Sequence, residues 1–280
     1  MIMFFYQLKC ELWKLFGKKR TYIGFMMFLL AQNVIIGFFH TQRVIRDITR
    51  TLELNGLSAS GFLSVLTVGT MMVTLMAYTL LPLYVALVGG DLVAKEAEDG
   101  TLRMILCRPI SRLRLLMLKW VAGGVFSFVL VLSLGIFGLV FTAFWFRWGG
   151  LFSVPPLLPF NFCPAGDGLM RYSLAHLFMV PKAVTIMTLG FMFSCFNVKP
   201  AAATILALSL TLISGIMQEL PYFHGWQDWF VTYHMNIWRE IFAEHIPWPQ
   251  IWASMIMLAG YNLTFLLIGC TAFHVRDIKS

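Results

Sequence analysis

Charge is scarce in this sequence. Among its 280 residues, 12% are charged and 59% are hydrophobic. A water-soluble globular protein typically carries about 25% charged residues. So little polar surface excludes a soluble globule, and the sequence predicts an integral membrane protein.

Reactive motifs are missing as well. The chain has no G-x-x-x-x-G-K-[ST] loop, so we do not expect it to bind ATP itself. Neither a nucleophile elbow, a zincin helix nor an inward-facing pair of acids is present, so catalysis lacks its reactants. We therefore expect no enzymatic activity, cofactor or metal in this chain. A membrane-embedded enzyme would have only Lys182 and the histidines at 224, 234 and 245 to use.

Cysteine is sparse, with five residues. Only Cys163 falls in a segment that we expect outside the cell, so no intramolecular disulfide is predicted.

Long apolar runs are what the chain does contain. About 20 apolar residues in a helix cross a bilayer core, and the runs are apolar on all faces, unlike the alternating strands of a membrane barrel. We therefore predict an all-α protein of a single domain (1–280) with six membrane-spanning helices: Tyr22–Phe39, Phe62–Gly90, Trp120–Phe146, Leu174–Phe196, Ala201–Met217 and Ile251–Phe273. An even number places both termini on one side.

The distribution of Lys and Arg predicts the orientation. One side carries fourteen of them, in both termini and in the even-numbered connectors, and the other side carries six. Positive residues near membrane ends favour the cytoplasm, so we expect both termini there, in a bacterial inner membrane. The formal net charge of +8 is explained by this asymmetry, so we expect no nucleic-acid partner but do expect contact with anionic lipid.

Two further segments are expected at the membrane surface. Residues 4–19 place apolar side chains at helical intervals between charges, which predicts an amphipathic interfacial helix. Residues 218–249 are rich in Trp and His, and we expect them to be interfacial or re-entrant on the outer side. Lys182 lies inside the predicted fourth span, near its outer end. Either its stem carries the ammonium to the headgroups, or it has a functional role.

The connector at residues 91–119 is where charge is concentrated. It begins "DLVAKEAEDGTLRMILCRPISR", and Gly100 permits a reversal of the chain after the second span. Pro109 ends the short helix that follows, and Ser111 is a plausible cap for the next one. The result is a compact polar elbow between two long helices. A soluble partner that gripped this elbow would tilt both helices.

The order E-x-E-D-G-T-L-R, then R-P-I-S-R and a later Lys resembles the permeases of type-2 ABC exporters (ABC-2-type transporter permeases). In that family this connector forms a cytoplasmic coupling helix that docks on the ATPase. The resemblance places Glu96, Gly100, Thr101, Leu102, Pro109, Ser111, Arg112 and Lys119 in the family's motif. The expected ATPase contacts are these residues without Lys119, and in addition Glu98, Arg103 and Arg108. The N-terminal helix then corresponds to the family's connecting helix.

The resemblance implies the transmembrane subunit of an ATP-driven exporter. Two copies of a separate ATPase would bind ATP and Mg²⁺, and a second permease would complete a homodimer or heterodimer. Six helices can scarcely enclose a sizeable route, which also favours a dimer. The alternative keeps the same ATPase but transmits mechanical work to a periplasmic partner without moving a solute. The sequence leaves both readings open.

Overall fold

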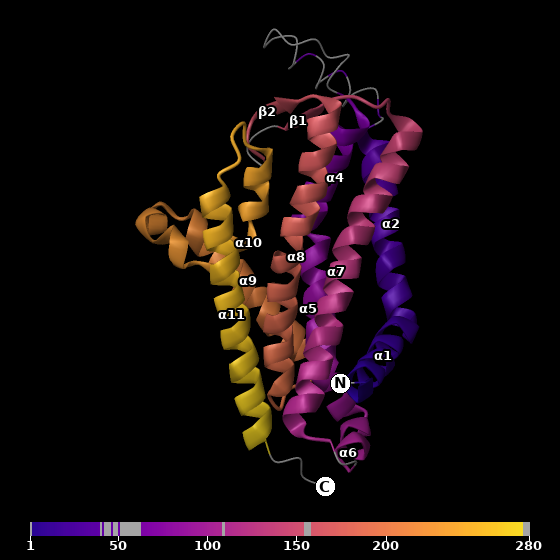
Figure 1. Cartoon of the computed structure of the whole chain (residues 1–280), viewed down its shortest axis with the longest axis vertical. Coiled ribbons are helices and arrows are strands. Elements are labelled where there is room, and N and C mark those ends of the chain that lie inside the picture. Colours follow the sequence, from indigo (N-terminus) through magenta and orange to yellow (C-terminus); the bar gives the residue numbers. More distant parts are fainter. Residues whose placement is uncertain are drawn as a thin grey trace.

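The computed structural model describes residues 2–39, 41, 46, 50, 63–107, 110–153 and 158–276. Its long helices run side by side along one axis (Figure 1). In chain order the α-helices of the described residues, long and short, are α1 (Ile2–Gly17), α2 (Lys19–Phe39), α4 (Val65–Tyr78), α5 (Leu80–Glu98), α6 (Thr101–Leu106), α7 (Arg112–Trp145), α8 (Ala165–Cys195), α9 (Pro200–Glu219), α10 (Val231–Met235) and α11 (Trp248–Val275).

The predicted all-α membrane protein is confirmed at this level. Within the described residues, α2, α7, α8, α9 and α11 are each long and apolar enough to cross a membrane, and α4 with α5 pass the same test as one bent pair. The start of α1 and the end of α11 lie at one end of the molecule, beside α6 (Figure 1). We call this the α6 end, and the opposite one the hairpin end.

The predicted second span is bent rather than continuous. Its two helices meet at Thr79 at an angle of 43°. Pro82 explains the break, because proline has no N–H to donate to the carbonyl of Tyr78 four residues earlier and its ring crowds that carbonyl. The Thr79 hydroxyl instead bonds the Leu75 carbonyl at 2.9 Å and closes the end of α4. The break places Tyr78 and Pro82 at mid-span.

Helix α8 is the centre of the bundle. In the most apolar 18-residue stretch of α8, two thirds (67%) of the residues are buried. The corresponding share is 17% for α9 and 22% for α2 and α11, so these three helices present most of their surface outward. The most extensive contact of α8 is with α5. There Gly89 and Gly190 let the two backbones approach: a Cβ at Gly89 would clash with the Met187 carbonyl, and one at Gly190 would lie 2.9 Å from the Ala86 carbonyl.

Helix α8 also begins nine positions before Leu174, where the sequence predicted the fourth span to start. Lys182 therefore lies 17 positions after the first residue of α8 and 13 before the last. At about 1.5 Å per residue, the Cα atom of Lys182 lies roughly 20 Å or more from either end of the helix. Lys182 is thus near the middle of α8, and its depth in the membrane stays a prediction.

The hairpin end is closed by short elements. Strands β1 (Leu151–Ser153) and β2 (Asn161–Cys163) pair antiparallel and are the exception to the all-helical architecture. Between α9 and α11 run two 3₁₀ helices, η2 (Pro221–Trp229) and η3 (Ile237–Phe242), with α10 between them.

The segment from η2 to η3 has two different halves. In η2, Tyr222, Trp226 and Trp229 are exposed, whereas in η3 Trp238 and Phe242 are buried against the bundle. Helix η3 contacts α8 and α11, and α10 contacts α8, α9 and α11. The second half of this connector is therefore part of the helical core. Its depth in the membrane stays a prediction.

The close approach of α5 and α8 gives a first prediction. Gly89→Ala should destabilise the protein by about 1–3 kcal/mol, because the new methyl group meets backbone that cannot move aside. Loss of the monodisperse peak on size-exclusion chromatography after heating in detergent measures the effect. Gly124→Ala in α7 is the matched control, since a Cβ there meets nothing within 4 Å and Ala favours a helix. Equal stability of the two variants would contradict the proposed packing.

Candidate functional site

The candidate site is the elbow formed by the end of α5, α6 and the start of α7. Helix α5 ends at Glu98, and Gly100 adopts φ +71°, the left-handed conformation that lets the chain turn back. Leu102 is buried and anchors α6 beneath the bundle. The Ser111 hydroxyl accepts a hydrogen bond from the Arg114 amide at 3.3 Å and caps α7, as predicted.

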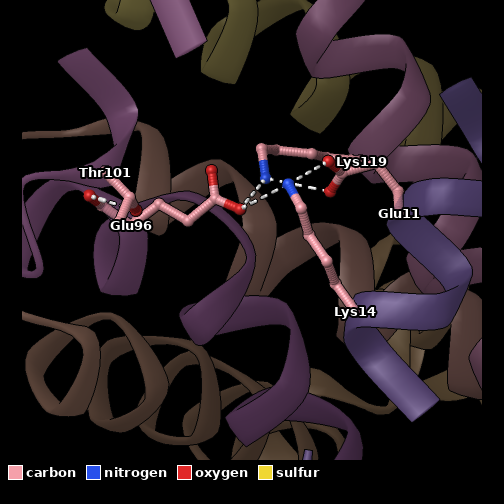
Figure 2. A network of polar contacts seen from close by, with 5 residues as sticks. All are labelled: Glu11, Lys14, Glu96, Thr101 and Lys119. Atoms are coloured by element: carbon pink, nitrogen blue, oxygen red, sulfur yellow. Dashed lines mark hydrogen bonds and ion pairs between the residues drawn. The ribbon is translucent and has the colours of Figure 1, made fainter. Parts of the chain in front are cut away.

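Four charged side chains meet behind this elbow, and Figure 2 shows them from close by. The Lys119 ammonium of α7 lies 2.7 Å from Glu96 Oε1 of α5 and 3.2 Å from Glu11 Oε2 of α1. Lys14 of α1 lies 2.7 Å from Glu11 Oε1 and 3.7 Å from Glu96 Oε1. We call these four residues the Lys119 cluster. It joins α1 to Glu96 of α5 and Lys119 of α7, which lie more than 80 positions later in the sequence.

Burial makes the Lys119 cluster strong. The Lys119 side chain is 2% exposed, and those of Glu11 and Glu96 are 13% and 15% exposed. Burial alone would raise the pKa of Glu11, but the neighbouring Lys119 and Lys14 ammonium groups hold it below its ordinary value. Burial likewise opposes charging of Lys14, yet Glu11 and Glu96 raise the pKa of Lys14 above its ordinary value. The charges of Glu11 and Lys14 are thus stabilised by their partners.

The outer rim of the elbow carries different residues. Glu98 and Asp99 are exposed and pair with Lys95 at 2.8 and 3.2 Å. Arg103 and Met104 on α6 are exposed as well. Of the predicted contact residues, Glu98 and Arg103 therefore face outward, whereas Glu96 and Leu102 point into the protein.

The remaining predicted contact residues also have intramolecular roles or lie elsewhere. Thr101 starts α6 and donates its hydroxyl to the Glu96 carbonyl at 3.3 Å. Arg112 donates to the carbonyls of His274 (3.1 Å) and Arg276 (3.3 Å) at the C-terminal end of α11, where a cation is favourable. Arg108 and Pro109 lie outside the described residues. Contact of any of these residues with an ATPase stays a prediction.

Lys182 is not part of the elbow. Its side chain is buried, and the ammonium donates to Asn236 Oδ1 at 2.8 Å and lies 4.4 Å from the centre of the Tyr78 ring. The stem therefore does not carry the charge to either end of the molecule. Enclosure of the ammonium by the protein favours an interior role over snorkelling.

Of the three outer histidines, His234 and His245 have described side chains, whereas the side chain of His224 lies outside the described part of the structure. His234 is buried and bonds Ser254 Oγ at 3.0 Å and the Asp228 carbonyl at 2.9 Å, which ties α10 to α11 and η2. His245 is exposed. Within the described ranges, no group of three or more His, Cys, Asp or Glu side chains is placed to hold a metal ion.

Sequence reasoning missed that Glu11 and Lys14 belong with the elbow. The available signal was a charged pair one turn apart on an amphipathic helix, which is typical of a solvated face. A second signal was Lys119, a cation at the start of a long apolar run, which needs a partner when buried. Neither signal identifies that partner, because the pairing joins positions 108 residues apart.

The Lys119 cluster gives a second prediction. Lys119→Met should release α1, because Glu11 and Glu96 would then share only the exposed Lys14 as a cation. Removing one partner of a buried pair costs about 3–5 kcal/mol. A nitroxide on Cys10, in a chain with the other exposed cysteine changed by Cys107→Ser, should become more mobile by electron paramagnetic resonance. Lys199→Met, which removes an exposed lysine, is the control. Unchanged mobility in Lys119→Met would show that the cluster does not hold α1.

A third prediction concerns pH. The pKa of Glu11 is lowered by folding, so its contribution to docking of α1 is full above its ordinary value of 4.5 and is lost as the pH falls below it. The pKa of Lys14 is raised, so its contribution is full below 10.5 and is lost as the pH rises above that value. The same nitroxide should be least mobile between these limits. Glu11→Gln should reduce the rise in nitroxide mobility at low pH. An equally steep rise in that variant would exclude Glu11 as its source.

Comparisons with known proteins place the chain in a family. The family described as "Protein of unknown function (DUF2705)" matches residues 25–279. The curated "Uncharacterized protein YhcI" of Bacillus subtilis (strain 168) is 24% identical over 203 residues, which cover 71% of this chain and 64% of that protein. The chain thus spans less than two thirds of that relative's length. Because the family match extends over nearly all of its spans, the chain belongs to the DUF2705 family.

Proposed function

We propose that this chain is the membrane-spanning permease subunit of an ATP-driven ABC exporter, with the elbow as its contact for a separate ATPase. The observation that carries the proposal is the Lys119 cluster. It links the end of α5 to the start of α7 and to α1. A force applied at α6 therefore reaches two long helices and the N-terminal helix together. A loose polar loop would dissipate such a force.

The division of residues at the elbow supports the same proposal. Glu98, Arg103 and Met104 form an exposed outer face, while Glu96 and Leu102 hold that face in place from behind. In this proposal the outer face meets the ATPase, and the inner residues transmit its motion. ATP and Mg²⁺ are bound by two copies of that ATPase, and the α6 end faces the cytoplasm across a bacterial inner membrane.

The packing of the helices supports a second permease copy. Helices α2, α9 and α11 present most of their apolar surface outward, where lipid or another protomer can cover it. In the proposal a homodimer or a related heterodimer forms there, and α1 lies in the headgroup region as the connecting helix.

A second candidate function is favoured by the hairpin end. Arg171 of α8 pairs with Asp167 at 2.9 Å and donates to the backbone carbonyls of Ile241, Ala243 and Glu244, and Asn161 of β2 donates to the Phe242 carbonyl at 2.9 Å. In the described part of this end, these bonds hold α8, β2 and the end of η3 together as one platform. A subunit that drives a periplasmic partner without moving a solute would need such a platform.

Cross-linking at the elbow gives the fourth prediction. Cys107 lies exposed at the C-terminal cap of α6, so a thiol-directed cross-linker should join it to an ATP-hydrolysing protein in membranes of the native host. The chain would carry Cys10→Ser to leave one exposed thiol, and Cys107→Ser is the control. Arg103→Glu on the same exposed face should reduce the yield at least severalfold, because reversing a charge at an interface opposes docking.

Two results would contradict the proposal. One is a Cys107 product that contains no ATP-hydrolysing protein. The other is a yield that Arg103→Glu and a second reversal, Glu98→Lys, both leave unchanged. Capture of an additional protein through the hairpin end, together with the ATPase at the α6 end, would favour the mechanical alternative.

A further inference from the structure

We propose that the chain binds the negatively charged head of a single-chain amphiphile at Lys182, with the apolar chain lying in a cavity between α5, α8 and α9. The site is at mid-bundle and is separate from the elbow. Nothing in the proposed ATPase coupling requires it.

The cavity has the size and character of a ligand site. Its volume is about 630 Å³, within the range of about 300–1,000 Å³ that is usual for small-molecule pockets. Leu83 of α5 and Leu212 and Ile216 of α9 line it, and each of these side chains is more than half exposed on the outside of the bundle. These exposed apolar side chains offer a route by which an acyl chain can enter from the bilayer.

Lys182 supplies an incompletely satisfied charge at the wall of this cavity. Its side chain is 4% exposed. An ammonium group has three donors. The described residues provide one hydrogen-bond acceptor, Asn236 Oδ1, and two aromatic rings, Tyr78 at 4.4 Å and the more distant Trp238 at 6.0 Å from the ring centre. No carboxylate among the described residues forms an ion pair with it. A buried cation without a counter-charge is costly, and an anionic head group would lower that cost.

The contrast with Lys119 strengthens the inference. Both lysines are almost fully buried, but Lys119 is held by two carboxylates of the chain itself. Lys182 instead borders the cavity and has no carboxylate partner among the described residues. The chain therefore supplies the counter-charge in one case and leaves room for it in the other.

The charges around the cavity define the head group further. Arg239 donates to the Tyr78 hydroxyl at 3.1 Å, so a second cation lies at the hydroxyl end of the ring that contacts Lys182. Glu219 lines the same cavity and is exposed. Its carboxylate disfavours a head group with several negative charges. A single negative charge, as on a fatty-acid carboxylate, fits this arrangement best.

Two proline-perturbed helices frame the site. Pro82 breaks the α4–α5 span beside Tyr78, and Pro181 stands inside α8 immediately before Lys182. Proline removes a backbone hydrogen bond at each place. The cavity and the cation are thus positioned by the two irregular points of the central pair of helices.

The test is binding of radiolabelled palmitate to the purified full-length chain in nanodiscs of a zwitterionic lipid, with no ATPase present. Lys182→Met should weaken binding about tenfold or more, because a charge-assisted hydrogen bond is lost. Lys182→Arg should retain most of the affinity. Hexadecanol, which has the chain without the charge, should compete poorly with palmitate for the wild-type protein. The affinity of hexadecanol itself should be the same for wild type and for Lys182→Met. Lys199→Met, distant from the cavity, is the control.

A second variant keeps the proposal testable if Lys182→Met fails to fold. Gly215 lines the cavity, and a Cβ there meets only Thr232 Cγ2 at 3.9 Å, so Gly215→Leu fills the space for the acyl chain without touching a charge. It should also reduce palmitate binding about tenfold. Unchanged affinity in Lys182→Met or in Gly215→Leu would overturn the proposal, as would hexadecanol binding as tightly as palmitate. Failure here leaves the cross-linking result at the elbow unaffected, so the two proposals fail separately.

Discussion

The α6 end of the molecule depends on one buried ammonium group. Lys119 enters the bundle at the base of α7 with 2% of its side chain exposed, and it is tolerated there because Glu96 and Glu11 approach from two other helices. Satisfying this charge fixes where α5 ends and where α1 lies, and thereby fixes the elbow between them. Arg112 and Arg276 extend the same end by binding backbone carbonyls of α11 and of the turn between α8 and α9.

The centre of the bundle follows a different constraint. Helix α8 is surrounded by α5, α7, α9 and α11, and glycines bring its backbone against that of α5. Close contact of this kind leaves no space beside Gly89. The cavity lies beside the break at Pro82, about two turns earlier in the same span. The cavity at Lys182 is therefore a consequence of the proline break combined with tight packing on either side.

Much of the architecture was predictable from local patterns. Apolar runs of sufficient length predicted the spans, and the reversal at Gly100 and the cap at Ser111 followed from the conformational preferences of those residue types. The direction of the side chains was not predictable in the same way. Glu96 and Glu98 are two positions apart in one charged run, yet Glu96 points inward and Glu98 outward, because only Glu96 lies on the face of α5 that meets α7 and α1.

The sequence by itself determined that this chain is helical and membrane-embedded, because composition and the length of apolar runs act independently of how the helices pack. It also determined where the polar elbow would be. Tertiary structure alone decided which charges pair, and which of the two buried lysines, Lys119 and Lys182, has no carboxylate partner among the described residues. Those outcomes depend on residues more than 50 positions apart, such as Lys119 with Glu11 and Lys182 with Asn236, and on the angle at which each helix meets its neighbours. No local pattern encodes that angle.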